Sequence, residues 1–407
     1  MGPRPHAGRG AGDRARAVPV RAAADLVSTA ASVLLDAVLR HGPVARSTIA
    51  RLTGLSHAVV TRNTAALVDR GLLAEVALPY QGIGRPHVPV DVDTERHVVA
   101  GLHIAHDHCT LALLDLRGRV RARLLLPHRD PGDPLDVLTA AADRLADLPG
   151  PAPLGLGVAV GGWVDADEGV LVEHTSLGWR DVPVRDLLAA RTGLPVLVDG
   201  HARALARAEQ LFGAAGRHES MVHLFVGNVV DAAIVTGGAT HRGARSAAGE
   251  VAHLAIGDPA IRCPCGRDGC LEATVSDRAW AWRAYREGVI DQPSIVDLVE
   301  AAVRGSASAV ASLVGRARLV GRAAALLADL VDPDVLVVTE YGVLRLPASV
   351  AALRAEAAVT SRVRTSPTAV RPSSFGEDVL GVAAGAVHLG ALYADPLSTR
   401  NPIRSGV

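Results

Sequence analysis

Three of the four cysteines in this chain of 407 residues lie within eight residues of one another, as Cys263, Cys265 and Cys270. His253 precedes the first of them by ten residues. Three thiolates and one imidazole are the ligands of a tetrahedral structural zinc site, and an ion that closes a short loop contributes folding free energy. A disulfide would leave one of the three thiols unpaired. We therefore predict a structural Zn²⁺ ion on these four residues and a core position for the fourth cysteine, Cys109.

The length and the distribution of charge predict several domains, of which only the first meets a polyanion. A chain of 407 residues exceeds what one hydrophobic core usually organises. Residues 1–90 carry eleven Arg and five acidic residues, a formal charge of +6, and the other 317 residues carry −6. No apolar run reaches the roughly 18 to 20 residues of a membrane helix, and no secretory signal is recognisable. The expectation is a soluble, cytoplasmic protein that does not bind membranes.

The N-terminal part alternates short apolar helices with glycine turns. The predicted elements are helices over residues 27–40, from Ser47 to the turn at Gly54, and from Ser56 to about Arg70, and strands over residues 72–76 and 87–92. Ser47 is the expected N-cap of the second helix, and Leu52 is expected to face inward. This order predicts a winged helix-turn-helix over residues 25–93, behind a flexible basic tail of residues 1–24. An ordinary helical bundle is the alternative.

Polar side chains of the helices and the hairpin have the chemistry to contact double-stranded DNA. Such groups donate to base edges or phosphates in the major groove, and an Arg at a hairpin tip suits the minor groove or the backbone. The candidate DNA-binding residues are Ser47, Ser56, His57, Thr61, Arg62, Asn63 and Arg85. The expected partner is therefore a DNA operator.

From about residue 97 onward, strand-like and helix-like segments alternate. The predicted strands cover residues 98–104, 110–114, 120–126, 155–160, 196–198, 223–226, 232–235 and 335–338, and the predicted helices cover residues 134–147 and 202–212. Hairpins followed by helical crossovers are typical of α/β lobes around a cleft. The second half is expected to repeat the first.

Several motifs resemble those of the ROK family of repressors, open reading frames and sugar kinases. They are Ala248-Gly249-Glu250-Val251-Ala252-His253, the stretch from Cys263 to Glu272, Gly84-Arg85-Pro86, Asp115-Leu116-Arg117-Gly118, Leu177-Gly178-Trp179 and Asp332-Pro333-Asp334. The resemblance covers nearly the whole chain and implies an actin-like ATPase fold of the ROK/hexokinase type over residues 97–395. It implies a small lobe of about 97–198, a large lobe of about 199–395, a sugar cleft between them and a C-terminal tail, 396–407. The winged domain in front is similar to the repressor branch.

The positions that carry kinase chemistry in the family are altered. The family's Glu-Asn-Asp triplet corresponds here to Asp199, Gly200 and His201, so the position of the catalytic Asp holds His201. The family's phosphate-binding turns correspond to His103, Ala105, His106 and Asp107, to Gly227, Val229 and Asp231, and to Thr339 and Glu340. Lost glycines remove backbone donors to phosphate, and new carboxylates repel it. The prediction is that the chain is not an enzyme.

The sugar-binding positions are partly kept. The resemblance implies ligand contacts from Ser176, His201, Glu250, His253 and Glu272, of which His253 also belongs to the zinc set. Alternatively, Glu250 and Glu272 only orient the zinc loop.

The predicted function is a DNA-binding transcriptional regulator, in the first instance a repressor. A homodimer or higher homo-oligomer would set the spacing of two winged helices on an operator, and a sugar-like effector in the cleft would change the affinity for DNA. One alternative is an active ATP-dependent sugar kinase with a fused DNA-binding domain. Another is a body that only dimerises and binds no ligand.

Overall fold

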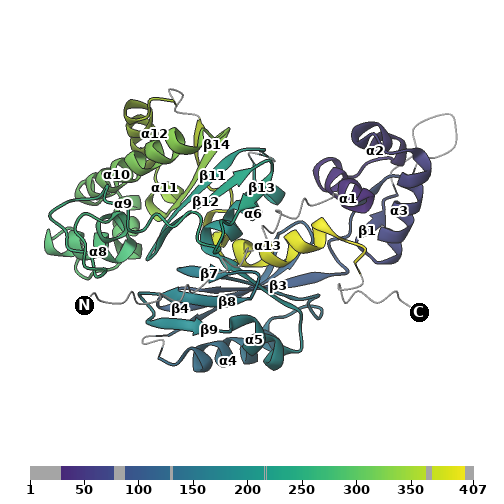
Figure 1. Cartoon of the computed structure of the whole chain (residues 1–407), viewed down its shortest axis with the longest axis horizontal. Helices are drawn as coiled ribbons and strands as arrows, with labels where there is room; N and C mark the ends of the chain where they lie inside the picture. Colours follow the sequence, from purple (N-terminus) through teal and green to yellow (C-terminus); the bar gives the residue numbers. More distant parts are fainter. Residues whose placement is uncertain are drawn as a thin grey trace, which may run out of the picture.

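The computed structural model of the chain describes residues 29–77, 88–128, 132–214, 216, 218–363 and 369–398. A small N-terminal domain stands beside an α/β body of two lobes (Figure 1). The predicted tail of residues 1–24, the hairpin tip with Arg85 and residues 399–407 lie outside the described residues. Within these ranges no single helix has the length and apolar composition to cross a membrane. Only α9 (Ile295–Val303) and α10 (Ala307–Val331) taken together have both, and the chain bends by 119° between them.

The N-terminal domain follows the predicted order of three helices and two strands. Its elements are α1 (Ala30–His41), α2 (Arg46–Thr53), α3 (His57–Asp69), β1 (Leu73–Glu75) and β2 (Val90–Val92). Gly54 ends α2 in the left-handed conformation at φ 71°, which glycine adopts without steric cost. The Ser56 side chain accepts a hydrogen bond from the Val59 N–H and so caps α3. The antiparallel pairing of β1 with β2 completes the arrangement expected of a winged helix-turn-helix.

Two details of α2 were predicted wrongly. Its N-cap is Ala45, which makes no side-chain cap, and Ser47 is an exposed residue of the first turn. The helix begins early because Val44 is tied to Val90 by a β-bridge directly before it. Leu52 is 46% exposed, since it lies on the side of this short helix opposite the buried Ala50.

The first lobe contains a five-stranded sheet in the order β10-β6-β3-β4-β5. The strands are β3 (Val98–Ile104), β4 (His108–Asp115), β5 (Val120–Pro127), β6 (Leu156–Val160) and β10 (Val196–Gly200). The first three form an antiparallel meander, and β6 and β10 run parallel to β3. The helices α4 (Pro134–Arg144), η1 (Leu145–Asp147) and α5 (Val184–Thr192) follow the strands, and α4 and α5 share a core with one face of the sheet.

A second small sheet in this lobe was not predicted. It consists of β7 (Trp163–Asp165), β8 (Val170–His174) and β9 (Trp179–Val182). Its strands have only three to five residues and little alternation of apolar and polar positions, so period-two patterning does not reveal them.

The second lobe repeats the strand order of the first. Its strands are β11 (Met221–Val226), β12 (Val230–Thr236), β13 (Ala239–His241), β14 (Val335–Glu340) and β15 (Val370–Pro372). The order β13-β12-β11-β14-β15 again places an antiparallel meander beside two parallel strands. The lobe's helices are α7 (Leu271–Val275), α8 (Asp277–Arg286), α9 (Ile295–Val303), α10 (Ala307–Val331), α11 (Tyr341–Arg345), α12 (Pro347–Thr360) and η3 (Gly376–Asp378). The predicted repeat is confirmed.

Two helices, α6 (His201–Phe212) and α13 (Val379–Ala394), pack against each other between the two sheets. In Figure 1 α13 is the yellow helix that lies along the first sheet, and α6 lies on the side of the second. The contact of α13 is close, because a Cβ at Gly157 of β6 would collide with the Ala384 carbonyl oxygen. The last strand of the first sheet, β10, ends at Gly200, two residues past the predicted end of the small lobe. The helix α13, which the prediction assigned to the large lobe, packs against the first sheet.

Candidate functional site

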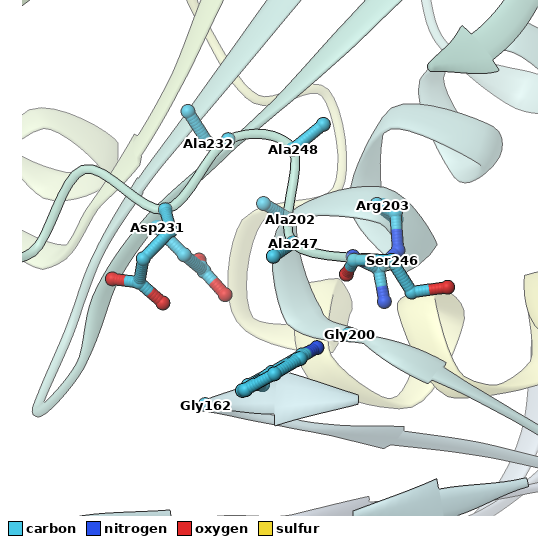
Figure 2. A pocket seen from close by; sticks show the side chains of 12 residues that line it. Gly162, Gly200, Ala202, Arg203, Asp231, Ala232, Ser246, Ala247 and Ala248 are labelled. Atoms are coloured by element: carbon cyan, nitrogen blue, oxygen red, sulfur yellow. The ribbon is translucent and has the colours of Figure 1, made fainter. Parts of the chain in front are cut away.

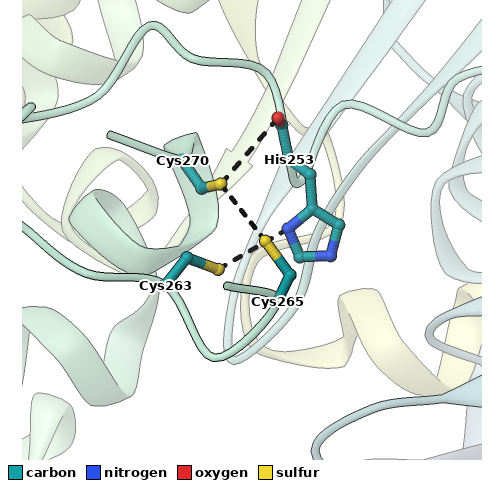
Figure 3. A group of neighbouring side chains, drawn as sticks. All are labelled: His253, Cys263, Cys265 and Cys270. Carbon is teal, nitrogen blue, oxygen red and sulfur yellow. Dashed lines mark hydrogen bonds between the residues drawn. The ribbon is translucent and has the colours of Figure 1, made fainter. Parts of the chain in front are cut away.

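The predicted metal ligands lie together in a loop of the second lobe (Figure 3). The donor atoms of His253, Cys263, Cys265 and Cys270 all lie within 4.8 Å of one another. Cys263 Sγ is 3.7 Å from His253 Nδ1, and Cys265 Sγ is 3.6 Å from Cys270 Sγ. Tetrahedral zinc with Zn–S bonds of 2.3 Å separates its sulfur ligands by about 3.8 Å. The donor set and its spacing thus fit a metal ion.

Tight turns hold the metal loop in this conformation. Gly266 and Gly269 have φ of 91° and 70°, and the Cys263 N–H donates to the Arg267 carbonyl oxygen at 2.8 Å. Cys109 lies apart from the loop, buried in β4, where burial raises the pKa of its thiol to about 12. The structure thus brings the four predicted ligand residues together and places Cys109 in the core, as predicted.

A shallow pocket, open to solvent on one side, lies between the two lobes (Figure 2). Its lining residues come from the first lobe, from the start of α6, from β12 and from the loop before the metal centre: Gly162, Trp163, Gly200, Ala202, Arg203, Asp231, Ala232, Ser246, Ala247, Ala248, Gly249 and Glu250. Of the five predicted ligand contacts, only Glu250 is among these residues. Gly200, the middle residue of the triplet Asp199, Gly200 and His201, also lines the pocket.

The other four predicted ligand residues are not among the residues that line the pocket. Ser176 Oγ lies 3.3 Å from His174 Nδ1, and Glu272 Oε2 accepts a hydrogen bond from the Val230 N–H at 3.0 Å. His253 belongs to the metal group, and His201 is buried beneath the lining. The sequence identified their neighbourhood, but the direction of each side chain is set by contacts between distant segments.

His201 is sealed in a stack of aromatic rings. Its imidazole stacks on His103 of β3 with ring centroids 4.3 Å apart, and Phe225 meets it edge-on at 5.1 Å. The ring nitrogens of both histidines have no hydrogen-bond partner within the described part of the chain. Burial lowers the pKa of His201 to about 3 and lowers that of His103 strongly, so both rings are neutral near pH 7.

Arg203 closes one end of the pocket and was not predicted. Its Nε donates to Asp199 Oδ1 at 2.5 Å, and its Nη1 and Nη2 donate to the carbonyl oxygens of Ser246 and Val164, each at 2.9 Å. All three guanidinium nitrogens are thus engaged. An Asp and an Arg four residues apart at a helix start could have suggested the pair, but not its contacts with the loops.

Asp231 lines the opposite side of the pocket. Its Oδ1 is buried and has no hydrogen-bond partner among the described residues, while the carboxyl accepts from the backbone N–H of Ala202. Burial, with the nearby carboxyls of Glu250 and Glu272, raises the pKa of Asp231 to about 7, against the opposing effect of Arg203. From the sequence, Asp231 was recognised only as the residue that replaces a glycine in one of the family's phosphate-binding turns.

A buried group of charges includes Glu340, which stands at one of the family's phosphate-binding turns. Arg316 is 0% exposed and binds Glu340 Oε1 at 2.5 Å and Asp277 Oδ1 at 2.6 Å. The Glu340 carboxylate also accepts from the N–H groups of Gly342 and Val343, at 3.0 and 2.7 Å, at the start of α11. These backbone donors are therefore satisfied inside the protein.

The N-terminal domain presents a polar face of α3. His57, Thr61 and Arg62 are exposed, and Thr61 Oγ1 donates to the His57 carbonyl oxygen at 2.9 Å. Asn63 is half-buried, and its Nδ2 donates to the Val59 carbonyl oxygen at 2.9 Å. Arg62 consequently remains the longest exposed donor among the predicted residues of this helix.

Arginines join the N-terminal domain to the body. Arg117 donates to the Leu39 carbonyl oxygen at 2.8 Å and pairs with Asp91, and Arg40 Nη2 donates to the Gln210 carbonyl oxygen at 3.2 Å. The last pair connects α1 with α6, the helix whose first residues line the pocket. A continuous set of contacts thus runs from the pocket to the domain that carries α3.

Comparisons with known proteins agree with this architecture. The sequence profile of the ROK family matches residues 99–389. Over 391 residues the chain is 37% identical to "Transcriptional regulator Rv0485" of Mycobacterium tuberculosis (strain ATCC 25618 / H37Rv), which covers 91% of this chain and 87% of that protein.

Two solved structures share the fold. A ROK family transcriptional regulator, a homologue of the E. coli MLC protein, superimposes with a TM-score of 0.70 at 23% identity, covering 89% of this chain and 96% of its own. A ROK family glucokinase from Streptomyces griseus in complex with glucose and AMPPNP gives a TM-score of 0.64 at 25% identity, covering 72% and 98%. The predicted fold class is confirmed.

Proposed function

The chain belongs to the ROK family, and on this premise we propose that it is a DNA-binding transcriptional repressor whose sugar-kinase-like body senses a ligand without phosphorylating it. The observation that carries the proposal is the exposed polar face of α3, with His57, Thr61 and Arg62, on a segment with a charge of +6. A basic domain with an exposed helix of this kind fits the major groove.

Regulation then depends on the geometry of two copies. A homodimer sets the spacing of two α3 helices on a pseudo-palindromic operator. A hydroxylated, sugar-like ligand in the pocket bridges the first lobe, α6 and β12, so it binds one arrangement of the lobes better than another. The contact of α6 with α1 through Arg40 passes this difference to the DNA-binding domain. The ligand thereby changes operator affinity.

The body lacks what phosphoryl transfer requires. A sugar kinase needs a base for the sugar hydroxyl and backbone donors for the phosphates. His201 stands at the family's base position, but it is buried against His103, and its pKa of about 3 makes it a weak proton acceptor. Glu340 takes up the N–H groups of Gly342 and Val343, and Asp231 adds a carboxyl at the second phosphate turn. The changes at Glu340 and Asp231 disfavour bound ATP.

The metal centre is proposed to be a structural zinc site. His253, Cys263, Cys265 and Cys270 would hold the ion, which supplies a cross-link for the loop. The loop also positions Glu250, the only predicted ligand residue that lines the pocket, through the Ala252 N–H that donates to its Oε1 at 3.3 Å.

Replacing Arg62 tests the DNA-binding role. Arg62→Ala is expected to weaken binding to a DNA site selected by the chain from a random pool by about 10-fold or more, because a base-contacting Arg contributes roughly 1–3 kcal/mol. Binding to unselected DNA should weaken less. Fluorescence anisotropy at fixed salt measures both affinities, with Arg318→Ala on the exposed side of α10 as the control. Equal losses on both DNAs would make Arg62 a phosphate contact.

An active sugar kinase is the second candidate, since the fold is shared with the glucokinase of Streptomyces griseus. We expect Mg-ATP at 1 mM to leave the melting temperature of the chain unchanged and hexoses to remain unphosphorylated. A ligand at a hundred times its Kd would stabilise by about 2.7 kcal/mol and be readily seen. Differential scanning fluorimetry and a coupled ADP assay, with a ROK glucokinase in parallel, provide the readouts. Saturable stabilisation by Mg-ATP together with ADP release would restore the kinase.

A further inference from the structure

The three cysteines of the metal loop differ in their access to solvent. Cys265 is exposed, whereas Cys263 is 4% exposed and Cys270 is 0% exposed. The Sγ atoms of Cys265 and Cys270 are 3.6 Å apart (Figure 3), and a disulfide needs them at about 2.05 Å. Cysteines that respond to oxidants are accessible to solvent and lie beside a second thiol that resolves the first oxidation product. This pair has both properties, an exposed sulfur for attack and a buried sulfur beside it.

The two sulfurs are carried by segments that are held differently. Cys265 lies on the outer turn of the loop, residues 264–268, all of which are exposed. Cys270 lies directly before α7, and the two backbone N–H groups that follow it donate to the carbonyl oxygens of Leu254 and Ala252, each at 2.9 Å. A shift of about 1.5 Å by the exposed turn brings the two sulfurs into bonding distance. The fixed Cys270 need not move.

We propose that Cys265 and Cys270 form a redox site at which a peroxide converts the two thiolates into a disulfide, so that the loop releases its metal ion. This inference rests on the proposed metal centre and adds to it a response to oxidants.

The reaction proceeds in two steps. The Cys265 thiolate attacks one oxygen of the peroxide, the O–O bond breaks, and the other oxygen leaves as hydroxide, so that Cys265 becomes a sulfenic acid. The Cys270 thiolate then attacks the Cys265 sulfur and displaces a second hydroxide. The two thiolates together lose two electrons to the peroxide, and the two hydroxides take up protons from solvent to become water.

Oxidation removes two of the four metal ligands. Cys263 and His253 remain, and two donors do not complete the tetrahedral shell of a structural zinc site. His253 follows directly after Ala252, whose N–H donates to Glu250 Oε1 at 3.3 Å. Loss of the ion therefore also loosens the segment that carries Glu250 at the pocket. The oxidant thus acts on the ligand pocket from a separate place on the surface.

Peroxide treatment of the full zinc-loaded chain tests the proposal. A chelating dye that changes colour on binding zinc follows the release of the ion, and peptide mapping by mass spectrometry identifies the disulfide. With hydrogen peroxide at about 1 mM, we expect one zinc ion to be released for each Cys265–Cys270 disulfide, and dithiothreitol with added zinc should reverse both changes. Zinc that stays bound, or that leaves without formation of this disulfide, would overturn the proposal.

Substitutions then assign the reaction to the exposed thiol. Cys265→His keeps four donors for zinc, because imidazole also binds the ion, but it removes the sulfur that the peroxide reaches. This variant should release zinc at least 10-fold more slowly than the wild-type chain. Cys109→Ala, which changes a buried cysteine outside the metal group, should release zinc at the wild-type rate. Equal rates in Cys265→His and the wild type contradict the proposal, and the disulfide mapping on the wild type decides if Cys265→His binds no zinc.

Metal analysis before oxidation separates this inference from the metal centre on which it rests. A chain that holds zinc and keeps it in peroxide retains the structural metal and loses the redox response. A chain that holds no zinc after reconstitution loses the metal centre, and the redox site with it.

Discussion

Cys270→Ser is expected to release the metal ion and to lower the melting temperature of the chain by about 10 °C or more. Cys270 is fully buried, and its Sγ, one of the four donor atoms, lies 3.6 Å from Cys265 Sγ. Structural zinc contributes about 10–16 kcal/mol in small zinc-finger peptides. A loss of roughly 1 kcal/mol lowers the melting temperature of a domain of 150–250 residues by 2–4 °C. Even a third of the zinc contribution is several times larger than 1 kcal/mol, so the expected decrease is large.

Metal analysis by mass spectrometry and differential scanning calorimetry measure the two effects. The wild-type chain should hold one zinc ion, and Cys270→Ser should hold none. Cys109→Ala is the matched control, because Cys109 is a buried cysteine of β4 outside the metal group, so its replacement should leave the zinc content at one. A Cys270→Ser chain that keeps both its zinc and its melting temperature would contradict a structural metal at this site.

Arg316→Met is expected to lower the free energy of unfolding by about 3–5 kcal/mol. The substitution keeps most of the side-chain volume but leaves the carboxylates of Glu340 and Asp277 without their common partner. Breaking a buried ion pair from one side has a cost of this size, because the remaining charges stay buried and uncompensated. The Val275 carbonyl oxygen also loses the hydrogen bond from Arg316 Nε, which is 2.9 Å long.

Chemical denaturation of both this variant and Arg318→Met provides the comparison. Arg318 lies two residues further along α10 and is exposed, so its replacement should change the free energy of unfolding by less than 0.5 kcal/mol. If both variants lose the same amount, the cost comes from the helix rather than from the buried charges. The triple variant with Glu340→Gln and Asp277→Asn should recover part of the loss, since both stranded charges are then removed.

The cluster of four candidate metal ligands could be predicted from the sequence because its residues lie close along the chain. Cys263, Cys265 and Cys270 share one short loop, and His253 enters from ten residues upstream. The repeat of the first half in the second was also predictable, because each half begins with a hairpin of apolar strands before its helices. In both cases the information is local.

The pocket and the buried charges could not be predicted in the same way. Arg316 meets its partners across 39 and 24 residues, and a charge inside a long helix pattern gives no sign of being buried. Asp231 was recognisable only as an altered glycine position, and its isolation depends on α6 and on the loop that carries Glu250. Such contacts follow from tertiary packing rather than from any period in the sequence.

The position of α13 has a consequence for the synthesis of the protein on the ribosome. The strands of the first sheet are complete at Gly200, but the helix that covers one face of that sheet begins only at Val379. Synthesis at about 5–20 residues per second leaves this apolar face without its cover for roughly ten seconds or longer. Nascent chains that stall before Val379 should therefore bind holdase chaperones, and release should coincide with the emergence of the last helix from the exit tunnel.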